Sequence, residues 1–150
     1  MESALDRPES VKLAVGVDGF MNTLTTDMGE DLDPSVVGIG FALKIRGFST
    51  VGEYFRTDLD TTGGGSVKGD SGYLQVGYLF SNNLEFAGRF ASIEPDNELV
   101  LDQVYAKGIA INYYFDKHSY KIQADYRQID NKTDDLEDLE VFRLQMQFSF

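Results

Sequence analysis

Apolar and polar residues alternate along most of this chain, which is the pattern of β-strands that have one apolar and one polar face. In the last stretch every second residue is large and apolar: Phe142, Leu144, Met146, Phe148 and Phe150. The residues between them are polar or charged. Clusters of Gly, Asn, Asp or Pro divide the chain into about eight predicted strands: 11–23, 36–47, 48–58, 71–81, 83–93, 103–116, 118–130 and 140–150.

The connections between these strands alternate between short and long. Three are tight turns, at Arg46-Gly47, at Ser81-Asn82-Asn83 and at Asp116-Lys117-His118. The other connections, 25–35, 59–70, 94–102 and 131–139, are long and rich in Asp and Glu. Short turns on one side and long loops on the other are typical of outer-membrane barrels. The pattern therefore predicts an all-β, transmembrane, up-and-down antiparallel β-barrel.

The apolar face is predicted to contact lipid. Its central positions are Leu74, Val76, Phe86, Ile122, Leu144 and Met146, and aromatic residues gather near both strand ends as two interfacial girdles. In 48–58 the pattern is weaker, because turning Glu53 inward takes Val51 and Phe55 with it. Lys107 falls on the apolar face near a long loop, where its side chain can extend to the interface.

The polar face carries seven basic and four acidic residues, predicted to form a lumen-facing charged network: Lys12, Asp18, Lys44, Arg46, Glu53, Glu85, Arg89, Lys121, Asp125, Arg127 and Arg143. In a barrel of about sixteen strands such charges line an aqueous channel and attract anions. In a closed barrel of about eight strands the interior is narrow, so the charges have to pair. In that case Glu85 and Arg89 should meet Lys121, Asp125, Arg127 or Arg143.

Composition narrows the function classes. The chain has 150 residues, which predicts one barrel domain over 11–150 preceded by an extension, 1–10. A net charge of −12 argues against nucleic-acid binding, and the absence of cysteine removes disulfides and thiolate sites. His118 is the only histidine, and its tight turn offers neither an orienting acid nor an oxyanion pocket, so we expect no enzyme. Residues 134–138 match no calcium loop, and we expect no metal or cofactor.

Two segments suggest processing or engineering. The opening MESALDRPES has no signal-peptide pattern, so we expect an exported chain that has lost its signal or gained a new initiator methionine. Gly63-Gly64-Gly65-Ser66 fits a synthetic flexible linker as well as a native loop.

The stretches GYLQVGYLFSNNLEFAGRFASIEPDN, IAINYYFDKHSYKIQADYRQID and FRLQMQFSF resemble the C-terminal half of the phosphate-selective porin O and P family. The match is good over 69–150 and fainter over 11–58. The resemblance implies a trimeric porin of about sixteen strands that passes phosphate or other anions. This chain holds about half of those strands, so no phosphate-binding residue of the family is carried over.

The apolar residues of the last strand, ending at Phe150, resemble the signal read by the barrel-assembly machinery. Expected partners are therefore outer-membrane lipid or detergent, that machinery and a second copy of the chain. Three functions stay open: a closed, non-conducting barrel, part of a larger anion pore, and a soluble lipocalin-like barrel with its apolar face inside.

Overall fold

The computed structural model describes residues 7–25, 31–61, 65–96, 103–116, 120–132 and 138–148. Its strands are β1 (Lys12–Met21), β2 (Leu24–Thr25), β3 (Asp31–Ile45), β4 (Phe48–Thr61), β5 (Ser66–Leu79), β6 (Leu84–Pro95), β7 (Val104–Asp116), β8 (Tyr120–Asn131) and β9 (Leu139–Phe148). They form one antiparallel sheet in the order β1-β3-β4-β5-β6-β7-β8-β9, with the short β2 beside β3. The predicted all-β, antiparallel up-and-down architecture is confirmed.

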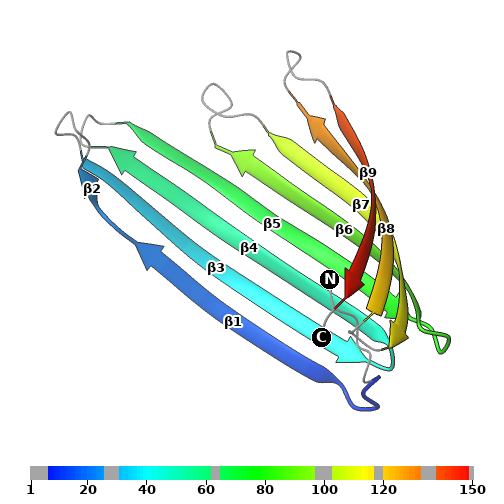
Figure 1. Ribbon diagram of the computed structural model, residues 1–150. Coiled ribbons are helices and arrows are strands. Elements are labelled where there is room, and N and C mark those ends of the chain that lie inside the picture. Colours follow the sequence, from blue (N-terminus) through cyan, green and yellow to red (C-terminus); the bar gives the residue numbers. More distant parts are fainter. Residues whose placement is uncertain are drawn as a thin grey trace.

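The sheet is curved but open (Figure 1). Strand β1 pairs with β3 and strand β9 pairs with β8, and the described residues contain no β1–β9 pairing. Closure into a barrel of about eight strands, one of the sequence-based expectations, is therefore not seen in this structure. Each edge strand leaves one row of backbone N–H and C=O groups without a strand partner among the described residues.

Strands β3, β4 and β5 extend three to five residues beyond the sequence prediction, and β6 two residues, all at the end that carries the long loops. Strand β3 begins at Asp31 rather than 36, β4 continues to Thr61 rather than 58, and β5 begins at Ser66 rather than 71. The ladder between β3 and β4 runs without interruption from Leu32 opposite Thr61 to Ile45 opposite Phe48. Hydrophobic alternation stops where the membrane would end, whereas backbone pairing between the strands continues. Periodicity alone therefore underestimates the length of these strands.

The turns at the opposite end are tight. Arg46 and Gly47 both have positive φ, 47° and 88°, as a two-residue hairpin requires. Arg46 was predicted to face the lumen at the end of a strand, but it lies in this turn, where its N–H donates to the carbonyl of Pro8 at 2.8 Å. The turn between β7 and β8, with His118, lies outside the described residues, as do 62–64 of the glycine-rich segment.

The two faces of the sheet differ in the way the alternation predicts. Large apolar side chains are exposed on one face, including Leu74, Val76, Phe86, Leu144 and Met146, with Ile122 half-buried among them. The buried polar residues are Ser49, Glu85, Asn112 and Asp125, which belong to the other face. Apolar outside and polar inside is the arrangement of a membrane barrel and the reverse of a soluble one. No helix in the described part of the chain is long and apolar enough to cross a bilayer.

Aromatic residues on the exposed face form two bands. Near the tight turns, ring pairs lie 4.8–5.8 Å apart: Tyr78–Phe80, Phe80–Phe86, Tyr113–Phe115 and Tyr120–Phe148. Toward the loops, Phe90 stacks on Tyr105 at 6.1 Å. These bands occupy the positions expected of interfacial girdles.

Strand β4 has the mixed faces that its sequence predicts. A Cβ added to Gly38 would lie 2.7 Å from the ring of Phe55 and 2.9 Å from Asp18 Oδ1, so Phe55 shares the polar face with Asp18. On the other face, the ring of Phe41 covers Gly52, whose added Cβ would lie 2.6 Å from it. Each glycine leaves room for an aromatic ring on the neighbouring strand, as in pairs that stabilise edge and barrel strands.

Candidate functional site

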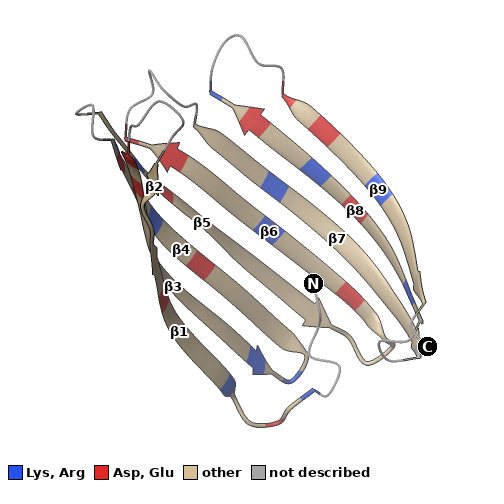
Figure 2. Ribbon diagram, turned by 60° about the vertical axis from the view of Figure 1, so that its left-hand side comes forward, with Lys and Arg blue, Asp and Glu red and all other residues tan. Residues whose placement is uncertain are grey.

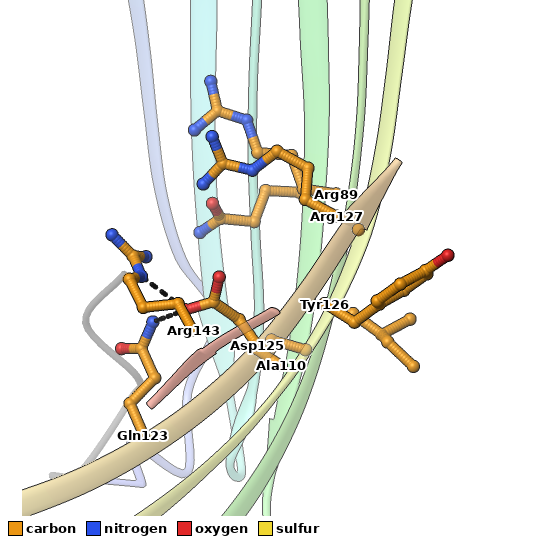
Figure 3. Close-up of a pocket in the computed structure, with 11 residues that line it drawn as sticks. Arg89, Ala110, Gln123, Asp125, Tyr126, Arg127 and Arg143 are labelled. Carbon is orange, nitrogen blue, oxygen red and sulfur yellow. Dashed lines mark hydrogen bonds and ion pairs between the residues drawn. The ribbon is translucent and has the colours of Figure 1, made fainter. Parts of the chain in front are cut away.

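Two arginines on the polar, concave face flank the same glycine on the strand between them. Arg89 on β6 and Arg127 on β8 both lie opposite Gly108 on β7. Their Cα atoms are therefore two strand spacings apart, about 10 Å. Figure 3 shows both guanidinium groups pointing to the same side of the sheet, whereas Tyr126 points to the other side. Neither arginine forms an ion pair with any carboxylate of the described residues.

Small residues form the floor around these arginines. Two adjacent hollows of about 140 and 190 Å³ are lined by Arg89, Arg127 and Gly108. Four alanines lie around that glycine on the same face, Ala87, Ala91, Ala106 and Ala110, while Gln75, Gln123 and Asp125 complete the lining of the first hollow. The guanidinium groups therefore extend over a surface from which no large side chain rises between them.

One ion pair lies beside these two arginines. Arg143 on β9 donates from Nε to Asp125 Oδ1 at 2.9 Å, and Gln123 donates to the same oxygen at 2.9 Å. Asp125 is buried and Arg143 is half-exposed. The cluster thus sets three arginines against one carboxylate, which leaves it with surplus positive charge.

Arg89 also contacts an aromatic ring on the neighbouring strand β5. Its guanidinium carbon lies 4.3 Å from the centre of the Tyr73 ring, a cation–π contact. Tyr73 in turn hydrogen-bonds to Glu53 on β4. The arginine is therefore positioned by an aromatic ring rather than neutralised by an acid, and its donors stay available.

The remaining predicted lumen residues do not join this cluster. Lys12 lies opposite Lys44, Asp18 lies opposite Gly38, and Lys121 lies opposite Tyr114. Figure 2 shows that basic and acidic positions both occur on β6, β8 and β9, with an acidic position within β4 and basic positions at the ends of β1 and β3.

The predicted partners of Glu85 are wrong. Glu85 is fully buried, and its Oε2 accepts hydrogen bonds from Asn112 Nδ2 at 2.8 Å and from the Tyr114 hydroxyl at 2.7 Å. Both donors are neutral. Asn112 and Tyr114 alternate on the same face as Glu85, which is the sequence signal for this neutral pairing.

A second charged cluster, not anticipated from the sequence, lies on the outward face beyond the loop-side aromatics. Arg56 donates to Asp70 at 2.9 Å and forks onto Asp96, and Tyr54 donates to Asp70 at 2.6 Å. Lys68 pairs with Asp58 at 3.4 Å. The hydrogen bond from Tyr54, and then Arg56, hold the pKa of Asp70 below its ordinary value. The signal was available: Tyr54, Arg56 and Asp58 alternate as one strand face.

The final strand places its apolar residues as predicted. Phe142, Leu144, Met146 and Phe148 are all exposed on the outward face, and Phe150 lies outside the described residues. Lys107, on the same outward face of β7, pairs with Asp130 at 3.1 Å near the loop end.

The fold, its exposed apolar face and its aromatic bands define an outer-membrane β-barrel protein of the porin class. The family model for phosphate-selective porin O and P matches residues 18–150. The chain belongs to this family.

Solved structures agree on the fold. An anion-selective porin from Comamonas acidovorans superposes with a TM-score of 0.70 at 13% identity, over 80% of this chain and 35% of that one. OmpT of Vibrio cholerae, in its trimer form, gives 0.58 at 17% identity over 86% of this chain and 46% of its own. This chain thus spans less than half the length of either structure. Comparison with curated proteins finds no significant match. Family and neighbours point to the outer membrane.

Proposed function

We propose that this chain forms part of the wall of a wide, water-filled pore for anions, with Arg89, Arg127 and Arg143 on the path of the solute. The observation that carries the proposal is the pair of arginines across Gly108, which has no carboxylate partner among the described residues. Unpaired basic groups on a water-lined wall raise the local concentration of anions. A narrow, sealed interior would instead leave these charges buried without partners, which is costly.

The open sheet supports a wide pore over a narrow barrel. Barrels of about eight strands have interiors that side chains fill, whereas barrels of about sixteen leave a channel. The described strands end at two unpaired edges, and the chain covers only 35% of the anion-selective porin that it resembles. Additional strands at both edges would complete a larger ring. The non-conducting alternative requires β9 to pair with β1.

The decisive test is the ion selectivity of the intact porin in planar bilayers. We expect Arg89→Gln and Arg127→Gln each to lower the chloride-to-potassium permeability ratio, measured as the reversal potential in a potassium chloride gradient. The double variant should lower it further.

The matched control is Lys107→Gln. Lys107 neighbours Gly108 in sequence and loses the same charge, but it lies on the outward face and pairs with Asp130. Its selectivity should equal that of the wild type. An unchanged permeability ratio in the double arginine variant, or an equal shift in the lysine variant, would refute the proposed path.

A further inference from the structure

An acid, an aromatic ring and an arginine occupy three successive strands of the concave face. Glu53 on β4 lies opposite Tyr73 on β5, and Tyr73 lies opposite Ala91 on β6, two positions from Arg89. The guanidinium carbon of Arg89 lies 4.3 Å from the centre of the Tyr73 ring, and the Tyr73 hydroxyl donates a hydrogen bond to Glu53. Tyr73 therefore contacts the arginine with its ring and the acid with its hydroxyl group.

Glu53 is close enough to Arg89 to form an ion pair if the ring were absent. The two residues are two strand spacings apart and two positions apart along the strand, which puts their Cα atoms about 12 Å from each other. Glu53 extends over Gly40 on the concave side, where a Cβ added to that glycine would lie 3.1 Å from Glu53 Cγ. Side chains on the concave side of a curved sheet converge (Figure 1). Two long side chains can therefore span this separation.

Glu53 also has no competing cation. It forms no ion pair with a described residue, whereas Asp125, on the other side of Arg89, is already paired with Arg143. A carboxylate and a guanidinium group form strong charge-assisted hydrogen bonds, often two at once. Such a pair would occupy the donors of Arg89 and cancel its charge at short range. A ring face attracts the guanidinium group but accepts none of these hydrogen bonds in their place.

We infer that Tyr73 is a positioning residue that keeps Arg89 and Glu53 apart, so that Arg89 stays available to a passing anion. This inference rests on the proposed anion path. Contact at both ends of Tyr73 keeps its ring between the two charged groups. An uncharged side chain thus determines whether a charged one contributes to ion selectivity.

The test is the chloride-to-potassium permeability ratio of the intact porin in planar bilayers. Tyr73→Leu removes no charge, yet it should lower the ratio by about the same factor as Arg89→Gln. Tyr73→Val, which keeps strand propensity, serves if the leucine variant does not fold. Tyr73→Phe keeps the ring and should retain the wild-type ratio. The matched control is Phe55→Leu, which removes a ring from the same face of β4 and should leave the ratio unchanged.

Two double variants separate spacing from a general disturbance of the wall. Glu53→Gln should raise the ratio by a larger factor in the Tyr73→Leu background than in the wild type, because only there does it also release Arg89. Tyr73→Leu should have no effect in the Arg89→Gln background. Equal effects of Glu53→Gln in both backgrounds, or a further fall of the ratio without Arg89, would overturn the inference.

A crystal structure of Tyr73→Leu provides a direct readout. It should show the Arg89 guanidinium group within ion-pair distance of the Glu53 carboxylate, and an arginine that stays apart from Glu53 would refute the role of Tyr73. The conductance results also distinguish two failures. If Arg89→Gln lowers the ratio and Tyr73→Leu does not, the anion path stands and the role of Tyr73 is wrong. If Arg89→Gln leaves the ratio unchanged, the path itself is wrong and the inference falls with it.

Discussion

Ile109 offers the sharpest test of which face contacts lipid. It lies on β7, paired on both sides, and its side chain is 67% exposed. It lies four positions before Tyr113 in the turn-side aromatic band and four positions after Tyr105 in the loop-side band. Four residues span about 13 Å along a strand, and a tilt of about 45° reduces this to about 9–10 Å of depth. Ile109 therefore lies close to the bilayer midplane.

Replacing Ile109 with Arg should cost about 2–4 kcal/mol of membrane-folded stability, the value for a basic residue at the midplane of a barrel. Phe115→Arg, on the same face but within the turn-side band at the membrane interface, should incur a cost of only about 0–1 kcal/mol for placing a basic residue at that depth. Ala110 lies on the concave face opposite Asp125, so Ala110→Arg should destabilise the protein least of the three variants if the pore is wide.

The assay is equilibrium unfolding in urea with the protein in lipid vesicles, followed by far-ultraviolet circular dichroism because the chain has no tryptophan. The order of destabilisation should be Ile109→Arg, then Phe115→Arg, then Ala110→Arg. If Ala110→Arg were as damaging as Ile109→Arg, or Ile109→Arg were neutral, the assignment of the outward face to lipid would be wrong.

Two further predictions concern individual contacts. Because the pKa of Asp70 is lowered in the folded protein, its stabilising contribution is present above the unfolded pKa of about 3.9 and is lost as the pH falls through the folded value. Asp70→Asn should therefore lower stability at neutral pH, and its difference from wild type should shrink toward zero in acid titrations; a difference constant with pH would contradict this. Gly52→Ala would set a Cβ 2.6 Å from the Phe41 ring and should destabilise by about 1–3 kcal/mol. Gly16→Ala, which has open space around it, is the matched control in the same unfolding assay, and equal effects would disprove the clash.

Much of the architecture can be predicted from period-two alternation because burial in lipid imposes it on every spanning residue. The outward positions Leu74 and Leu144 follow directly from it, and so do the tight turns, where Gly47 and Asn83 adopt the positive φ that such turns require. Alternation fails where lipid ends. The polar extensions of the strands at the loop end carry no hydrophobic signal, so Lys68, Asp70 and Asp96, the partners of Asp58 and Arg56, fell in the predicted loops 59–70 and 94–102.

The candidate site was harder to predict, since it depends on register between strands. The sequence places Arg89 and Arg127 on the polar face, but only the ladders reveal that both lie opposite Gly108. Likewise, Glu85 was assigned charged partners because opposite charges are the usual solution for a buried acid. Its real donors, Asn112 and Tyr114, are neutral and lie one strand away.

The small residues beneath the arginines separate two properties of the proposed passage. Ala91, Ala106 and Ala110 line the hollows but carry no charge, whereas the guanidinium groups of Arg89 and Arg127 carry charge on flexible stems. In the proposed passage, the alanines shape the wall between the arginines without influencing the sign of the permeating ion. Enlarging the alanines would narrow the sieve and leave its electrostatic preference intact, so size exclusion and ion preference can change independently along this wall.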